Sequence, residues 1–122
     1  MVMANEKIKS FQDLIMWQKA KSFAIHIYKV TGNFPKEELY GITNQLRRAA
    51  ISIPSNIAEG FRRRSQKDKI HFSRMAYGSG AEIETQLIIA QELDYLSDDE
   101  YMELQSELTE IMKMINVVIN KL

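Results

Sequence analysis

The sequence predicts an all-α protein folded as an up-down-up-down antiparallel four-helix bundle. Its 122 residues suit a single domain, and 45% of them are hydrophobic and 26% charged, as in globular proteins. Only five Gly and two Pro occur, whereas a β-sandwich or barrel needs a turn about every ten residues. Four long stretches carry apolar residues at helical spacing, and the short connections between them make neighbouring helices antiparallel.

The first helix is expected to begin near Ser10, after a flexible tail over residues 1–9, and the bundle domain to span residues 10–122. Ser10 with Asp13 makes a variant of the capping box that opens helices. Gly32 is suited to the helix end that follows, because glycine is the preferred C-terminal cap. The predicted buried face consists of Leu14, Trp17, the stem of Lys21, Ala24, Tyr28 and Thr31, widened by Phe11, Ile15 and Ile25.

A second helix is predicted over residues 39–60, where apolar residues recur at steps of three and four, close to the seam of a bundle. Gly41 is expected to loosen its first turns. Pro54 removes one backbone hydrogen bond and should bend this helix without ending it. The predicted seam is Leu39, Ile42, Leu46, Ala49, Ile53, Ile57 and Gly60.

Two further capping boxes, Ser65 with Asp68 and Ser97 with Glu100, predict where the third and fourth helices begin. Apolar residues again recur every three or four positions after each box. The third stripe is Phe72, Ala76, Gly80, Ile83, Leu87 and Ala90. The fourth is Tyr101, Leu104, Leu108, Ile111, Ile115, Val118 and Leu122.

Charged residues on the second and third helices are expected to face one another. If the two helices pack antiparallel about a turn near Ser65, positions whose numbers sum to about 130 lie opposite. Arg48 then falls opposite Glu82, and Arg47 near Glu84. These pairs are interpreted as salt bridges between helices or between subunits.

A polar row and two glycines lie on the same pair of helices. Ser52, Asn56 and Glu59 follow one helix past its proline, and such a row is interpreted as a satisfied network or a subunit contact. Gly78 and Gly80 each cost about 1 kcal/mol against Ala inside a helix, and this cost is offset if another backbone approaches closely there. A loop at these glycines is the alternative, although the apolar stripe passes through them in register.

The net charge is zero, yet its distribution is uneven. Residues 47–74 carry a net charge of +6, whereas residues 75–112 carry ten acids and no Lys or Arg. Clustered cations neutralise phosphates and release counterions, so the cluster predicts nucleic-acid binding at one end of the bundle. A solvated turn, stabilised by the C-terminal helix dipole, is the alternative. The predicted contacts are Arg62, Arg63, Arg64, Lys67, Lys69 and Arg74.

Other classes of site find little support. The chain has no Cys, which excludes disulfides, thiolate catalysis and Cys-based metal centres. His26 and His71 lie on different predicted helices, and neither has a carboxylate three or four residues later, so we expect no metal and no cofactor. Phosphate-binding loops and nucleophile motifs are missing, so we expect no enzyme. The longest aliphatic run is residues 87–90, which predicts a cytoplasmic protein without a membrane span.

Two strings carry a family resemblance: QLRRAAISIPSNIAEGFRR at residues 45–63 and AYGSGAEIETQL at residues 76–87, preceded by LIMWQKA and NFPKEELYGIT. They resemble the bacterial four-helix-bundle family of proteins encoded in 23S ribosomal RNA intervening sequences, and accessory proteins of diversity-generating retroelements are similar. The resemblance extends from residue 11 to about 96. It implies a ring-like homopentamer without an established enzymatic activity. For the retroelement relatives it implies a basic surface that binds nucleic acid and a reverse-transcriptase partner.

The leading hypothesis is a non-enzymatic homo-oligomeric bundle that binds RNA or DNA through the basic turn between its second and third helices. The alternative is a protein-interaction scaffold with no nucleic-acid role. The acidic surface over residues 82–110 suits contact with the basic end of a neighbouring subunit, because head-to-tail contacts between opposite charges generate rings when the rotation closes.

Overall fold

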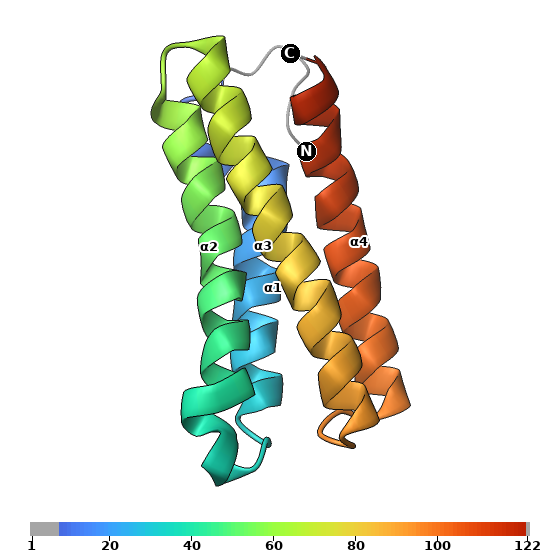
Figure 1. The fold of residues 1–122 in the computed structure, drawn as a ribbon. Helices are drawn as coiled ribbons and strands as arrows, with labels where there is room; N and C mark the ends of the chain where they lie inside the picture. The colour runs from blue at the N-terminus through green and yellow to red at the C-terminus, as the bar shows by residue number, and fades with distance from the viewer. Residues whose placement is uncertain (1–7, 122) are drawn as a thin grey trace.

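The computed structural model describes residues 8–121, and four helices lie side by side in it, each antiparallel to the next along the chain (Figure 1). The predicted all-α, four-helix architecture is confirmed. None of the helices within this range is long and apolar enough to cross a membrane. Residues 1–7 of the expected tail, and Leu122 of the fourth stripe, lie outside the described residues. The long helices are α1 (Ile15–Thr31), α2 (Asn44–Arg62), α3 (Gln66–Glu92) and α4 (Asp98–Lys121).

The capping box at Ser10 opens a different element from the one predicted. The Ser10 hydroxyl accepts a hydrogen bond from the backbone N–H of Gln12 (3.1 Å), and the Asp13 carboxylate accepts from the Ser10 N–H (3.1 Å). This box caps a 3-10 helix, η1 (Phe11–Asp13). Leu14 is then extended (φ −75°, ψ 125°), so α1 begins only after it.

The other two predicted helix starts are confirmed. At α4, the Ser97 hydroxyl accepts from the Glu100 N–H (3.1 Å), and the Glu100 carboxylate accepts from the Ser97 N–H (2.9 Å), which completes the box. At α3, the Ser65 hydroxyl accepts from the Asp68 N–H (3.1 Å). Each bond satisfies a backbone donor that the first turn of a helix leaves free.

The buried face of α1 differs from the predicted one. Of the predicted members, Ile15, Ile25 and Tyr28 are 56%, 49% and 41% exposed. The prediction is confirmed for Ala24 and Thr31, which are buried, and for Leu14 and Trp17, which pack against the core. The rest was wrong because apolar residues lie all around this helix, so that their spacing does not single out one face. The buried residues of α1 are Ala20, Phe23, Ala24, Ile27, Val30 and Thr31.

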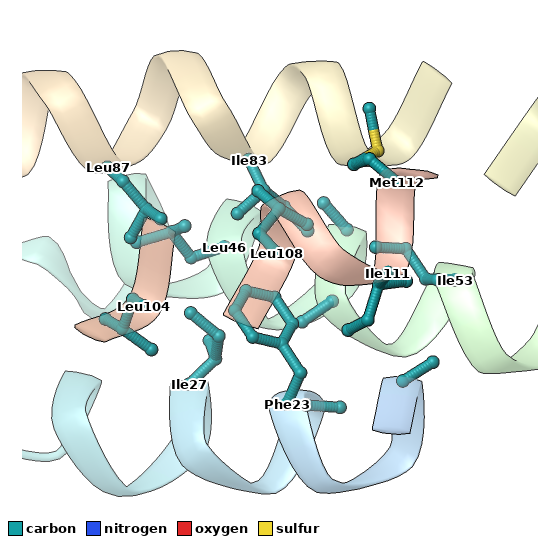
Figure 2. Close-up of a cluster of buried hydrophobic side chains, with 14 of the residues drawn as sticks. Phe23, Ile27, Leu46, Ile53, Ile83, Leu87, Leu104, Leu108, Ile111 and Met112 are labelled. Atoms are coloured by element: carbon teal, nitrogen blue, oxygen red, sulfur yellow. The ribbon is translucent and has the colours of Figure 1, made fainter. Parts of the chain in front are cut away.

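The core is a continuous layer of aliphatic side chains between the four helices (Figure 2). The seams predicted for α2, α3 and α4 supply most of it, and Leu39, at 45% exposure, is the main exception. Burying one such side chain contributes about 1.5–3 kcal/mol. The largest fully buried residues are Phe23, Ile27, Leu46, Ile53, Ile83, Leu87, Leu104, Leu108, Ile111 and Ile115.

The start of α2 is loosened at glycine, as predicted. A 3-10 helix, η2 (Lys36–Glu38), leads into a π-helical segment, η3 (Leu39–Thr43). Within η3, Gly41 has non-helical angles (φ −109°, ψ −121°), and α2 becomes regular only at Asn44. Pro54 lies inside α2, which continues to Arg62.

Of the two glycines of α3, only Gly80 accommodates a neighbour, and that neighbour is a side chain of α4. Gly78 and Gly80 lie within unbroken helix, which excludes the loop alternative. A Cβ at Gly80 would overlap the Sδ of Met112, so this glycine accommodates a side chain of α4. A Cβ at Gly78 would meet no atom within 4 Å. The prediction that another backbone approaches closely at these glycines is therefore wrong within the chain.

Candidate nucleic-acid interface

The six predicted phosphate contacts gather at one end of the bundle. Arg62 ends α2, Arg63 and Arg64 form the turn, and the other three lie on the first turns of α3, at the end of the bundle where α2 and α3 meet (Figure 1). Five of the side chains are exposed. Lys69 is half-buried.

Two of these cations also hold the turn together. The Lys69 ammonium donates to two carbonyl oxygens at the C-terminus of α2 (3.2 and 3.4 Å), which helix ends leave without partners. The Arg63 guanidinium pairs with Glu59 (3.1 Å) and lies 4.8 Å from the ring centre of Phe72. A stabilised turn therefore accounts for Lys69 and, in part, for Arg63.

Three other cations have no such role. Within residues 8–121, Arg64, Lys67 and Arg74 are exposed and form no salt bridge. Lys67 lies in the first turn of α3, where the helix dipole disfavours positive charge. Helix stability therefore gives no reason for this charge.

Phe11 extends the basic end with an aromatic surface. The guanidinium of Arg62 lies 5.3 Å from the centre of the Phe11 ring, and that ring packs edge-on against Trp17 at 5.1 Å. Shallow crevices of about 430 Å³ and 340 Å³ adjoin Phe11, and Phe61 lines the larger. Sequence analysis missed Phe11 as part of this surface, because η1 reaches α2 only through the fold.

The opposite end of the bundle is acidic, so the charge separation along the sequence becomes a separation in space. The end of α3, the connection that follows it and the first turn of α4 carry Glu92, Asp94, Asp98, Asp99 and Glu100. The last three also suit the N-terminus of α4, where the helix dipole favours anions.

A hydrogen bond anchors the loops at the acidic end. The Tyr95 hydroxyl donates to the Glu38 carboxylate (2.8 Å), and this bond, together with burial and nearby negative charge, raises the pKa of Tyr95. The Phe34 ring packs 5.5 Å from that of Tyr95. The connection before α2 is thereby tied to the end of α3.

The polar row on α2 is a satisfied network, as predicted. The Ser52 hydroxyl hydrogen-bonds that of Ser79 on α3 (2.8 Å). The Asn56 amide donates to the Ser52 carbonyl (2.8 Å) and hydroxyl (2.9 Å). Glu59, the third member, pairs with Arg63 one turn further along. The Ser52–Ser79 contact also agrees with the predicted register of the two helices.

The salt bridges predicted between α2 and α3 do not form within the chain. Over residues 8–121, neither Arg47 with Glu84 nor Arg48 with Glu82 makes an ion pair. Glu82 instead accepts from the Gln86 amide on its own helix (3.1 Å). The predicted register specifies which residues of α2 and α3 lie at the same height along the bundle. It does not specify how each helix is rotated about its own axis, and this rotation determines which neighbour a side chain contacts.

Arg47 holds α2 to α1. Its Nε donates to the Thr31 hydroxyl (2.9 Å) and its Nη2 to the Tyr28 carbonyl (3.3 Å). The guanidinium also lies 4.7 Å from the Tyr28 ring centre. Thr31 is buried and donates in turn to the Ile27 carbonyl (2.7 Å). Arg47 therefore makes a structural contact with α1 instead of the predicted salt bridge with Glu84.

A second polar cluster lies between α1 and α4. His26 Nδ1 is 2.9 and 3.0 Å from the two carboxylate oxygens of Glu107, and its Nε2 is 3.9 Å from Glu103. The sequence did not predict this cluster, because its two carboxylates are far from the histidine in the chain. Both come from α4, 77 and 81 positions after His26.

Comparisons with known proteins agree with the family resemblance. The family model described as 23S rRNA-intervening sequence protein matches residues 12–117. A crystal structure of a protein of unknown function from the S23 ribosomal protein family of Bacteroides thetaiotaomicron VPI-5482 is similar, with 26% identity and a TM-score of 0.78 over 86% of this chain and 98% of that one. No curated protein shows a significant match. The chain therefore belongs to the 23S rRNA-intervening sequence protein family.

Proposed function

We propose that this chain is a non-enzymatic, cytoplasmic, homo-oligomeric protein that binds RNA or DNA through the basic end of its bundle. The observation that carries the proposal is that four exposed cations near the turn between α2 and α3, Arg62, Arg64, Lys67 and Arg74, form no salt bridge within residues 8–121. Such a group attracts the phosphate backbone by releasing its counterions, without reading sequence. The ring of Phe11 beside Arg62 adds a surface on which an unpaired base can stack.

Replacing Arg62, Arg63 and Arg64 together by Glu tests this proposal. The change reverses three charges at the basic end and leaves every core residue in place, so binding to a labelled single-stranded oligonucleotide should be lost. For about four phosphate contacts on a single strand, the wild-type log K should fall with log[salt] at a slope near −3. Fluorescence anisotropy measures both.

The control reverses charge at the other end, by Lys29→Glu with Lys36→Glu, and should keep the affinity. Light scattering and circular dichroism report whether assembly and helix content persist in each variant. Loss of binding with unchanged mass supports the proposal. A wild type that binds no RNA or DNA at low salt overturns it. So does a triple variant that dissociates while it retains affinity for nucleic acid, because the cluster would then be an assembly contact.

Exposed apolar side chains on the outside of the bundle support self-association. Ile15 and Ile25 on α1, and Ile88, Ile89 and Met102 on α3 and α4, are 42–67% exposed. Exposed apolar side chains of this size are candidates for subunit contacts when they gather in a patch. The family resemblance implies five subunits, and contact between the basic and acidic ends offers a head-to-tail route to a ring.

Light scattering at micromolar concentration should therefore give a mass of several times 14.2 kDa, and five times for a pentamer. A monomeric mass would contradict self-association.

The same apolar side chains favour the second candidate function, a protein-interaction scaffold, for which a reverse transcriptase is the partner that the resemblance suggests. A stable oligomer without affinity for nucleic acid is the result that distinguishes the scaffold from the proposed function.

A further inference from the structure

We propose that His26, Glu103 and Glu107 form a binding site for a divalent transition-metal ion, such as Zn²⁺, between α1 and α4. The three side chains each offer one ligand atom, and these atoms lie within 4.8 Å of one another. One comes from α1 and two from successive turns of one face of α4. This site is separate from the basic end and does not depend on the proposed function.

The distances suit a common ion. Zinc lies about 2.0–2.2 Å from imidazole nitrogen and carboxylate oxygen, so two such ligands of one tetrahedral ion are roughly 3.4 Å apart, and His26 and Glu107 would separate by a few tenths of an ångström to admit it. His26 Nδ1 is 2.9 and 3.0 Å from the oxygens of Glu107. Glu103 is 3.9 Å from the other ring nitrogen and its side chain is 65% exposed, which leaves it free to turn towards the ion.

The donor set selects the class of metal. An imidazole with two carboxylates suits Zn²⁺ and neighbouring transition ions, whereas Mg²⁺ and Ca²⁺ prefer oxygen ligands alone. The site is negative, since it brings two carboxylates, Glu103 and Glu107, to one imidazole. The nearby cation Lys19 forms a salt bridge with Glu110 (3.0 Å) rather than with either of these carboxylates. A dication is therefore favoured at this position.

An access route adjoins the cluster. A groove of about 410 Å³ runs between α1 and α4, and Glu107 lines it together with Ser22 and Ile111. Hydrated ions can reach the carboxylates through this groove. A bound ion would link two helices far apart in the chain, and would therefore stabilise the folded state over the unfolded one.

The simpler arrangement is a metal-free contact, in which the His26 ring hydrogen-bonds Glu107. Metal binding would replace this hydrogen bond, because a ring nitrogen that coordinates a metal cannot also carry a proton. The two arrangements therefore differ in whether Zn²⁺ changes the stability of the protein, and thermal unfolding measures that change directly.

The test uses tag-free, full-length protein, titrated with Zn²⁺ by calorimetry and with Co²⁺ by visible absorption. One ion per chain should bind, and Zn²⁺ at roughly 100 times its dissociation constant should raise the melting temperature by about 10 °C. His26→Gln and Glu103→Gln should each weaken Zn²⁺ binding by more than the roughly 10–100-fold that loss of an outer-shell partner costs.

Glu110→Gln is the matched control. It makes the same charge change on the same helix, at a residue that pairs with Lys19 rather than with the histidine. Zn²⁺ binding should persist there and in His71→Gln, and circular dichroism confirms that each variant folds. The proposal is overturned if the wild type shows no saturable binding. Retained affinity in His26→Gln, or lost affinity in His71→Gln, overturns it equally.

Discussion

Replacing Ile27 by Ala should lower the free energy of unfolding by about 2–5 kcal/mol, whereas the same change at Ile25 should cost about 0.5 kcal/mol or less. Ile27 is fully buried in the core, and Ile25 is 49% exposed on the other side of α1. The loss at Ile27 combines lost burial with the cavity left behind, which a helix packed between α2 and α4 closes only in part. Denaturant titration followed by circular dichroism measures both costs.

The two variants form a matched pair, since they remove the same atoms two residues apart on one helix. Ile25 also belongs to the apolar surface proposed for self-association, so the mass of each variant should be measured alongside. Equal losses of stability with unchanged mass would contradict the orientation of α1. A large loss at Ile25 that is accompanied by dissociation would instead place this residue in a subunit contact.

The sequence predicted the bundle well wherever one face of a helix is apolar and the other polar. On α4 the spacing of Leu104, Leu108, Ile111 and Ile115 leaves one possible buried face, and all four are buried. On α1, apolar residues surround the helix, so the spacing alone allowed several faces. The predicted face included Ile25, which is exposed in the structure. Packing against the neighbouring helices determines which face of α1 is buried, and the sequence of α1 alone does not specify it.

The candidate sites divide in the same way. The basic cluster could be predicted because its members are close together in the chain. Contacts between distant segments could not, and they include Arg47 with α1 and His26 with Glu103 and Glu107. In each case the rotation of a helix about its own axis determines the partner. That rotation is fixed by packing of the whole bundle rather than by local sequence.

Gly80→Leu should destabilise the protein by about 1–3 kcal/mol or more, because the core at this position is already filled. Met112 of α4 occupies the space that a side chain at position 80 would enter, and it is 8% exposed. The sequence alone suggested that the cost arises between α2 and α3. The structure instead places the clash between α3 and α4. If this is right, a second substitution that shortens Met112 should reduce the cost of Gly80→Leu.

A double-mutant cycle with Met112→Ala separates the two explanations. Met112→Ala alone should cost about 2–5 kcal/mol through the cavity it leaves. In that background the larger residue fills vacated space, so Gly80→Leu should cost less by about 0.5–3 kcal/mol than in the wild type. Additive effects would show that the leucine clashes with another helix. Gly78→Ala is the internal control: its Cβ would meet open space, so the variant should gain up to about 1 kcal/mol from helix propensity, whereas Gly80→Ala should not.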